Sequence, residues 1–248
     1  ISKEIISANK PMIVIGESLL KLSSAKYLFN LIKDFLKKNN KFTESWSPLN
    51  ILSCDAATVG NFDLGILNNG INLLEELKSN KFEIVYLVGQ DNLEFNKKDE
   101  FIIYQGSHGD KGAEIADIIL PGSAYTEQDG YYTNLEGKIQ KAYKASYPPG
   151  DAKEDWIIFN ELAEIFHNKK LFNNKEDLDN SMFNQINLYL EKNKSKNFVE
   201  INDLNFNKEN LLINNLDYYY SNVIARASKT MFECRDAKAN LQLTATEA

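Results

Sequence analysis

The chain has 248 residues, of which 43% are hydrophobic and 25% are charged, and its net charge is −7. This length and composition predict a globular protein with a sizeable core, built as one large domain or two small ones. Nucleic-acid binders usually gather Lys and Arg on one face, so the acidic balance argues against nucleic acid as a partner. No apolar run approaches the roughly 18 residues that a membrane span needs, and we expect no direct membrane insertion.

Short apolar runs alternate with helical stretches in the first half of the chain. The predicted strands are Met12–Ile15, Ile51–Leu52, Phe82–Val88, Phe101–Tyr104 and Ile118–Leu120, and the predicted helices are Ser23–Lys38 and Ile71–Lys78. This alternation predicts an α/β fold with a mostly parallel sheet flanked by helices. Continuous apolar runs are typical of strands that are buried on both faces.

The first predicted helix has apolar residues at helical spacing. Tyr27, Leu31 and Phe35 form one stripe, with Leu28 and Ile32 beside it. A stripe of this kind usually faces the core, so we expect Lys33 to lie on the opposite, solvated face.

The residue pattern of the chain changes after Asp129. Residues Asp129–Ile139 place turn residues at each end of a β-prone run, which predicts a hairpin or a tight excursion. We expect Gly137 to take a conformation that a Cβ disfavours. Pro148-Pro149-Gly150 predicts a turn. Asp151 and Glu154 have the spacing of a capping box, so we expect a helix to begin at Asp151.

That helix carries an apolar stripe of Trp156, Phe159, Leu162 (or Ala163) and Phe166. We expect Trp156, Phe159 and Phe166 to be packing residues. Beyond it we predict a helix near Met182–Lys192, an extended connector over Lys194–Asn215, a last helix over Tyr218–Ala237 and a frayed tail. The stripe of the last helix is Tyr220, Ile224, Ala227, Met231 and Cys234.

Metal-ligating residues are scarce. Zinc and iron–sulfur sites need several thiolates or imidazoles at short spacing. The chain has two cysteines and two histidines, none closely paired, so we predict no metal site: Cys54, Cys234, His108 and His167. Cys54 is interpreted as a small buried hydrophobe in preference to a reactive thiol.

The best local candidate for ligand binding is the glycine-rich segment Gln105–Gly112, which follows a predicted strand. Its candidate residues are Gly106, Gly109, Asp110 and Gly112. Glycines in this position either let backbone N–H groups approach an anion or form a structural crossover loop, and spacing alone leaves both open. Ser107, His108 and Asp110 are neighbours on one loop, whereas triad partners come from separate elements, so we predict no catalytic residue.

Several blocks of the sequence resemble one family. The blocks are Tyr104–Glu127, Tyr132–Gln140, Pro148–Trp156, Lys10–Gly16 and Asp217–Met231. They are similar to the C-terminal half of the large iron–sulfur subunits of respiratory complex I, NADH:ubiquinone oxidoreductase, in their mitochondrial form. The central blocks are specific, and the Asn-rich stretch 169–215 is not.

The resemblance implies a degenerate molybdopterin-oxidoreductase-like α/β domain over 1–167 and an Asn-rich helical extension over 168–248. That extension ends in a helix that packs back on the domain or on neighbouring subunits. In active relatives, segments like Asp117–Pro121 and Thr133–Lys138 surround a pterin, but Lys138 stands where those relatives usually have Arg. The complex I members of this superfamily are taken to have lost the cofactor, so the resemblance implies that the loop is vestigial and that this chain holds no cofactor. The 2Fe-2S and 4Fe-4S clusters are expected on the N-terminal half of the subunit.

The function implied by the resemblance is that of a non-catalytic structural part of the peripheral arm of complex I. It supports the cluster-bearing half during electron transfer from NADH to ubiquinone. The implied partners are that half and other peripheral-arm subunits, on the matrix side of the mitochondrial inner membrane. The alternatives are a pterin- or nucleotide-binding oxidoreductase domain that uses the loop Gly106–Gly112, and a free soluble interaction module. Both a separately encoded half and a C-terminal fragment of a longer chain remain open.

Overall fold

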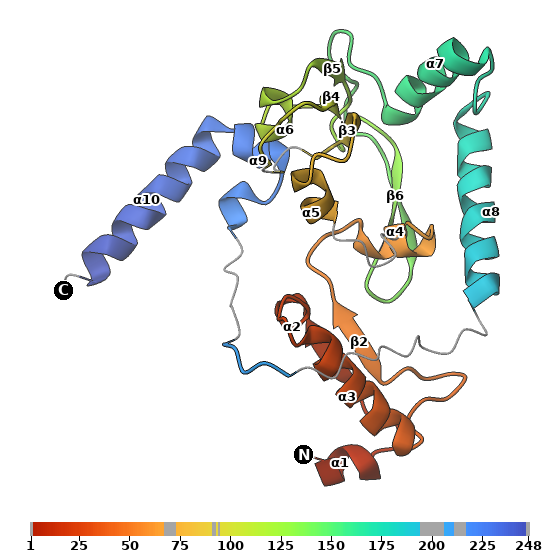
Figure 1. Ribbon diagram of the computed structural model, residues 1–248, viewed down its shortest axis with the longest axis vertical. Helices are drawn as coiled ribbons and strands as arrows, with labels where there is room; N and C mark the ends of the chain where they lie inside the picture. Colours follow the sequence, from red (N-terminus) through yellow and green to blue (C-terminus); the bar gives the residue numbers. More distant parts are fainter. Residues whose placement is uncertain are drawn as a thin grey trace. The chain divides into compact units, whose positions relative to one another are not determined.

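The computed structural model describes residues 2–66, 73–90, 93, 95–193, 206–210 and 217–246. The chain divides into two compact units. Figure 1 labels their helices and strands. Unit 1 contains Ile1–Gly65, Tyr132–Gln140 and Gln185–Asn215, and unit 2 contains Ile66–Tyr131, Lys141–Asn184 and Leu216–Ala248. The domain boundary between residues 167 and 168 stays a prediction.

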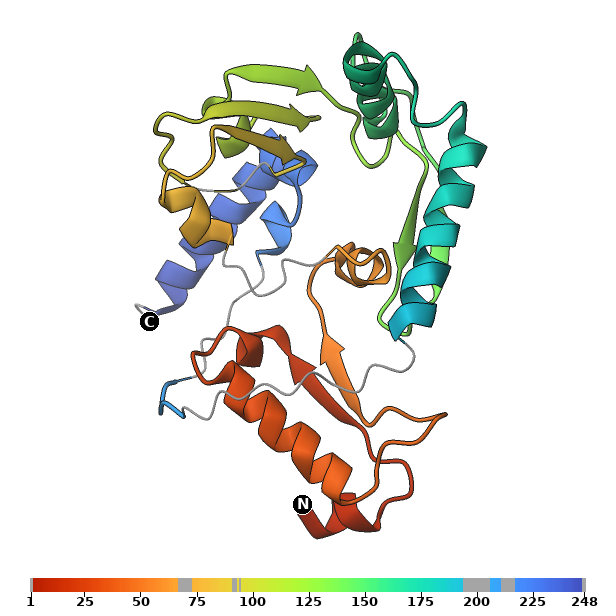
Figure 2. The same cartoon turned by 45° about the vertical axis from the view of Figure 1, so that its right-hand side comes forward.

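Unit 1 is built around two short parallel strands. Its elements, in chain order, are α1 (Ser2–Ser7), β1 (Ile13–Gly16), α2 (Glu17–Leu20), α3 (Ala25–Lys38), β2 (Leu49–Leu52) and α4 (Thr58–Asp63). β1 pairs with β2 so that Ile15 lies opposite Ile51, and α3 runs alongside the pair (Figure 2). Both predicted strands of this unit are therefore confirmed.

The face that α3 buries differs from the predicted one. Leu31 is 54% exposed, whereas Leu36 is fully buried and Lys33 is only 3% exposed. Lys33 and Leu36 are three residues apart and thus share one side of the helix. The prediction was wrong because apolar residues occupy adjacent rows of this helix, and spacing alone does not say which row packs. The Lys33 ammonium donates to Asn30 Oδ1 at 3.0 Å, which satisfies part of its hydrogen-bonding capacity.

Unit 2 holds a three-stranded, wholly parallel sheet in the order β3-β4-β5. Its elements are α5 (Leu73–Lys78), β3 (Ile84–Val88), β4 (Phe101–Gly106), α6 (Lys111–Glu114), β5 (Ile118–Pro121) and α7 (Asp155–His167). The predicted α/β class with mostly parallel strands is confirmed, and each strand lies within two residues of its predicted bounds. Of the helix predicted over Ile71–Lys78, the first two residues lie outside the described part of the chain.

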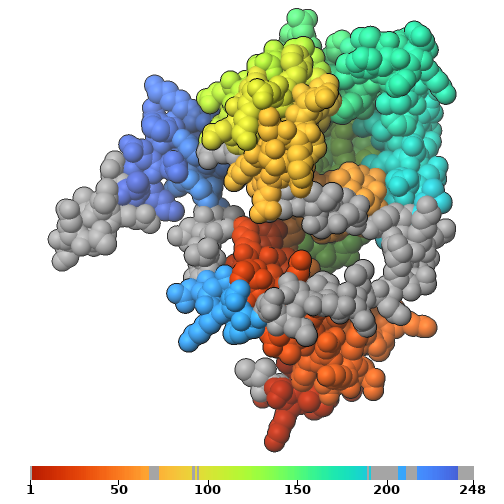
Figure 3. Space-filling model, in the orientation of Figure 1, coloured from red at the N-terminus to blue at the C-terminus, as the bar shows by residue number. Residues whose placement is uncertain are grey.

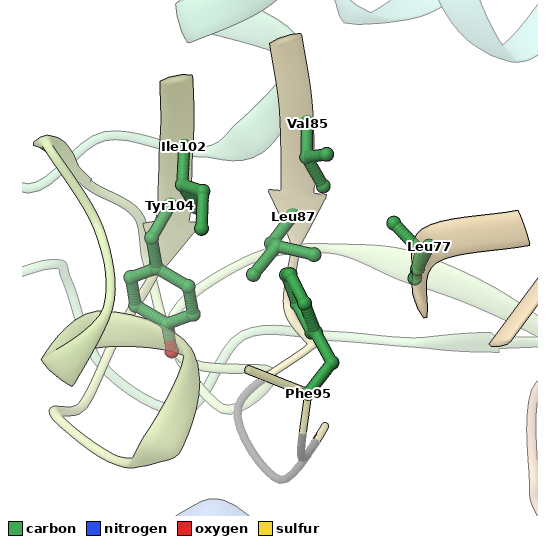
Figure 4. Close-up of a cluster of buried hydrophobic side chains, with 6 residues drawn as sticks. All are labelled: Leu77, Val85, Leu87, Phe95, Ile102 and Tyr104. Atoms are coloured by element: carbon green, nitrogen blue, oxygen red, sulfur yellow. The ribbon is translucent and has the colours of Figure 1, made fainter. Parts of the chain in front are cut away.

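The core of unit 2 lies between the sheet and the short helices α5 and α6. Figure 4 shows Val85 and Leu87 of β3 beside Ile102 and Tyr104 of β4, with Leu77 of α5 on the other side. Phe95 completes this cluster. Every member is at least nine-tenths buried, and apolar burial of this kind contributes about 25 cal/mol per Å².

The apolar runs predicted strands that are covered on both faces, but the strands of unit 2 are partly uncovered. On β3, Val85 is buried but its neighbour Ile84 is 63% exposed. Ile118 and Ile119 of β5 are also exposed. The expectation of two covered faces is wrong for this chain, because the helices described in unit 2 cover only part of the sheet.

The segment after Asp129 forms the predicted hairpin. β6 (Gly130–Thr133) and β7 (Ile139–Ala142) make a two-stranded sheet. In the turn, Asn134 Oδ1 accepts hydrogen bonds from the backbone N–H groups of Glu136 at 3.0 Å and Lys138 at 2.9 Å. Gly137 has φ +81°, the left-handed region that favours glycine.

Replacing Gly137 by valine is expected to lower the free energy of unfolding of unit 1 by more than about 1 kcal/mol, because a β-branched side chain is strained at positive φ. The space around Gly137 is open, so the cost is conformational and not steric. Urea denaturation followed by the fluorescence of Trp46, with Trp156→Phe in the background, measures it. Gly137→Asn is the matched control and should cost less, because Asn tolerates this region; equal midpoints for Val and Gly would contradict the expectation.

The helix that contains Trp156 begins later than predicted. α7 starts at Asp155, and Asp151 lies in the turn that precedes it. The prediction of a capping box formed by Asp151 and Glu154 is therefore wrong. The backbone N–H of Lys153 donates to Pro121 O, and Ser123 N donates to Lys153 O. These bonds hold residue 153 in an extended conformation against the end of β5. The helix therefore begins only at Asp155.

The predicted packing stripe of α7 is correct only in part. Trp156 and Phe159 are partly buried, and the Phe159 ring packs edge-on against Tyr86 at a centroid distance of 5.9 Å. Phe166 is 73% exposed, so the prediction that it is a packing residue is wrong within this chain. The buried residues of α7 are Ile158, Asn160 and Ala163. Ala163, the predicted alternative to Leu162 in the stripe, is therefore confirmed as a packing residue.

The C-terminal region is helical but broken. α8 covers Lys175–Asn193, and the single predicted last helix is instead a 3-10 turn η1 (Tyr218–Tyr220), α9 (Val223–Ala227) and α10 (Lys229–Thr246). Asn222 caps α9 by accepting from Ala225 N at 2.9 Å, and Ser228 is extended between α9 and α10. These breaks rule out one continuous stripe. α10 continues to Thr246, into the segment predicted to be frayed. The connector predicted over Lys194–Asn215 lies mostly outside the described residues.

Candidate functional site

The glycine-rich loop wraps around one buried aromatic side chain. β4 ends at Gly106, and Asp110 forms the N-cap of α6, so the loop turns back within four residues. Tyr104 is 1% exposed, and its hydroxyl donates to the carbonyl oxygen of His108 at 2.9 Å. The loop therefore has a tyrosine at its centre.

Two of the three loop glycines are required by close packing. A Cβ on Gly106 would overlap the ring and hydroxyl of Tyr104. A Cβ on Gly112 would overlap the carbonyl oxygen of Gln90 and lie 3.0 Å from the Tyr104 ring. At Gly109, by contrast, a Cβ would meet no described atom within 4 Å.

Asp110 uses both carboxylate oxygens within the chain. One oxygen accepts from the backbone N–H of Lys111 at 2.9 Å. The other accepts from Nε of Arg226 on α9 at 2.7 Å, which makes an ion pair of two partly buried groups. The carboxylate thus stands at the beginning of α6, where a bound anion would otherwise face the backbone N–H groups.

The four candidate residues run from the end of β4 (Gly106) through the loop (Gly109 and Asp110) into α6 (Gly112). Asp110 does not support nucleophilic catalysis. Ser107 Oγ lies 3.0 Å from His108 Nδ1. A triad would need a carboxylate on the far side of the imidazole, and Asp110 is directed to Lys111 and Arg226 instead.

A polar cluster next to the loop was missed by sequence reasoning. Gln105 is fully buried, donates from Nε2 to Asp155 Oδ1 at 2.6 Å, and accepts a short hydrogen bond from the Tyr86 hydroxyl. Asp155 also accepts from Gln128 Nε2 at 3.2 Å. Burial, and then the charge of Asp155, raise the pKa of Tyr86 above its ordinary value. A glutamine directly after an apolar strand was the only signal in the sequence.

The two segments that resemble pterin-contacting motifs make structural bonds. Asp117 accepts from the backbone N–H of Ile102 at 2.8 Å and from Lys97 Nζ at 2.5 Å, and both bonds lower the pKa of its carboxyl. It thereby joins the start of β5 to β4. In the other segment, Asn134 shapes the hairpin turn and Lys138 is exposed.

Both cysteines are exposed, so the interpretation of Cys54 as a buried hydrophobe is wrong. The backbone N–H of Cys54 donates to Glu17 Oε1 at 2.8 Å. Desolvation, and then the Glu17 carboxylate, raise the pKa of the Cys54 thiol, which disfavours the reactive thiolate.

The described residues contain neither a metal-binding cluster nor a membrane-spanning helix. No three or more of their His, Cys, Asp and Glu side chains gather where they could hold a metal ion. None of their helices combines the length and the apolar composition that crossing a membrane requires.

The sequence blocks that resemble the complex I subunits lie within longer matches to known proteins, which cover most of the chain. Residues 1–165 match the family model described as molybdopterin oxidoreductase. The chain is 38% identical over 246 residues to the NADH-ubiquinone oxidoreductase 75 kDa subunit of Reclinomonas americana, an alignment that covers 94% of this chain and 35% of that protein.

Two further relatives give the same picture. An NADH-quinone oxidoreductase subunit of Rickettsia bellii is 36% identical over 246 residues, which cover 97% of this chain and 35% of the relative. The mitochondrial NADH-ubiquinone oxidoreductase 78 kDa subunit of Candida albicans is 36% identical over 252 residues, which cover 94% and 34%. The chain therefore spans about a third of the length of the curated relatives that it matches.

Proposed function

We propose that this chain, which belongs to the molybdopterin oxidoreductase family, is a non-catalytic structural part of the peripheral, NADH-oxidising arm of respiratory complex I. It supports the cluster-bearing part of the large subunit while electrons pass from NADH to ubiquinone. Support comes from relatives named as NADH-ubiquinone and NADH-quinone oxidoreductase subunits, which align with nearly the whole chain.

The observation that carries the structural role is how the glycine-rich loop is filled. Tyr104 occupies its centre, Gly106 and Gly112 are required by packing, and the Asp110 carboxylate is bonded to Lys111 and Arg226. A pterin or nucleotide phosphate needs free N–H groups and space at such a loop. These residues do not fit a cofactor cradle, and we assign the loop to holding β4, α6 and α9 together.

The proposed partners follow from the same relatives. They are the rest of the large subunit, on which we expect the 2Fe-2S and 4Fe-4S clusters, and neighbouring subunits of the peripheral arm. The proposed location is the matrix side of the mitochondrial inner membrane, as part of a membrane-bound assembly.

The test is to tag this chain in its own cells, solubilise the membranes mildly and separate the complexes on a blue-native gel. We expect the tag to co-migrate with NADH dehydrogenase activity and with subunits of the membrane arm, as identified by mass spectrometry. Migration of the chain as a free protein would overturn the assignment to complex I. Molybdenum, tungsten or pterin in stoichiometric amounts with the chain would overturn the structural role.

A loop variant separates support from cofactor binding. Gly109→Ala places a methyl group in the open part of the loop without touching Tyr104. If the loop is structural, both the amount of assembled complex and its NADH oxidation rate should stay unchanged. A cofactor held in that space would be displaced, and the rate per assembled complex would then fall.

A further inference from the structure

The sheet of unit 2 has an open edge at β3. β3 is the first strand in the order β3-β4-β5, and no strand among the described residues pairs with its other side. Phe101 N donates to Glu83 O and Gly89 N donates to Gln105 O, so every second residue from Glu83 to Gly89 turns its backbone toward β4. Ile84, Tyr86 and Val88 therefore turn their N–H and C=O groups toward the open edge.

An apolar groove of about 450 Å³ runs along this edge. Much of its lining comes from leucines of α5, from apolar side chains of β3, and from a phenylalanine two residues before β3: Leu73, Leu74, Leu77, Phe82, Ile84 and Val85. Side chains from both faces of β3 take part, since Ile84 and Val85 point to opposite sides of the strand. The groove thus lies beside the strand and not over one face of the sheet.

The apolar groups of this groove face solvent in the isolated chain. Leu73, Leu74, Phe82 and Ile84 are all exposed. Figure 3 shows the atoms of α5 and β3, in orange-yellow, on the surface of the face turned to the viewer. Parallel sheets are almost always covered, and an open apolar edge invites the addition of a strand.

We propose that this edge and groove receive one more β-strand, supplied by the part of the complex I large subunit that this chain does not span. The proposal rests on the function proposed above. Relatives aligned with 94–97% of this chain are about three times as long, so their sequence holds ample length for a missing strand. The strand runs parallel to β3, as do all the strands in this sheet.

The groove also defines the chemistry of the incoming segment. Its backbone pairs with the free groups of Ile84, Tyr86 and Val88, which requires about five extended residues without an internal proline. Side chains on one of its faces pack on the leucines of α5, and those on the other continue the face of Ile84. Both rows are therefore apolar and rich in β-branched residues. A second copy of this chain would pair antiparallel about a two-fold axis, which breaks the parallel order.

Cross-linking identifies the occupant. The photo-reactive residue p-benzoylphenylalanine replaces Phe82 in the groove, and Tyr143, which is exposed outside the groove, is the matched control. The chain is irradiated within the purified complex, and the adducts are sequenced. We expect Phe82 to link to an apolar segment of the remaining large subunit and Tyr143 not to link to that segment. Links from Phe82 to a second copy or to another subunit, or no links, would overturn the proposal.

Two substitutions at one position test the backbone pairing. Ile84→Pro removes an N–H group that faces the open edge and leaves the bonds to β4 intact, whereas Ile84→Thr keeps the N–H group. With this chain and the rest of the large subunit produced as separate polypeptides, we expect proline to reduce their co-purification by at least about tenfold and threonine by less than about threefold. Unchanged far-UV circular dichroism confirms that each variant folds. Equal losses for both variants would overturn the strand pairing.

These outcomes are distinct from those of the proposed function. If the chain co-migrates with complex I but Phe82 links elsewhere, the assignment to complex I stands and the added strand is wrong. If the chain does not co-migrate, the assignment itself fails.

Discussion

Replacing Tyr104 by alanine should lower the free energy of unfolding of unit 2 by about 3–5 kcal/mol, the range for removing a large buried aromatic side chain. Tyr104 is the largest fully buried side chain in the described residues and packs with Ile102, Leu87 and Phe95 in one cluster. It also fills the glycine-rich loop, so its loss leaves a cavity and frees the carbonyl oxygen of His108. Urea denaturation followed by the fluorescence of Trp156, in a Trp46→Phe background, measures the change.

Tyr104→Phe separates packing from hydrogen bonding. This variant keeps the ring and removes the hydroxyl that donates to His108, so we expect a cost of about 1 kcal/mol. If Phe and Ala cost the same, the ring does not provide the main stabilisation, and the interpretation of the loop as a shell around Tyr104 fails.

Replacing Gly112 by alanine should lower the free energy of unfolding of unit 2 by about 1–3 kcal/mol, the usual cost of overpacking. The added methyl group would overlap the backbone carbonyl oxygen of Gln90, which cannot move aside as the end of a flexible side chain can. It would also press on the Tyr104 ring. The same fluorescence measurement reports the shift in the urea midpoint.

Gly109→Ala is the matched control for Gly112→Ala, because it adds the same group to the same loop in open space. We expect its free energy of unfolding to lie within about 0.5 kcal/mol of the parent chain. A large loss of stability at Gly109 together with none at Gly112 would contradict the assignment of Gly112 as the constrained glycine and Gly109 as the open one.

The apolar patterns predicted where strands form but not how they are covered. Runs such as Phe101–Tyr104 are short, apolar and bounded by turn residues, so each was predicted within two residues of its observed bounds. The same runs predicted two covered faces, and Ile84 and Ile118 are exposed. Composition reports that a side chain is apolar, whereas burial depends on which other elements reach it.

Helix boundaries and faces depended on tertiary bonds. Asp151 has the right spacing to Glu154 for a cap, but the hydrogen bonds of Lys153 and Ser123 at the end of β5 keep the chain extended until Asp155. In α3, neighbouring apolar rows offered two faces, and packing selected the row of Leu36. Local spacing cannot resolve a choice that partners distant in sequence make.

The sequence by itself determined the α/β class, the position of the glycine-rich loop after β4, and the family to which its blocks belong. Only the tertiary structure decided what that loop contains. Asp110 and Arg226 are 116 residues apart in sequence and form an ion pair, and Gly112 is constrained by Gln90 on another loop. Strand and loop signals are local in the chain, while the filling of a loop depends on residues that folding brings together. For this reason the choice between an anion cradle and a structural crossover was open in the sequence, and the packing around Tyr104 favours the structural crossover.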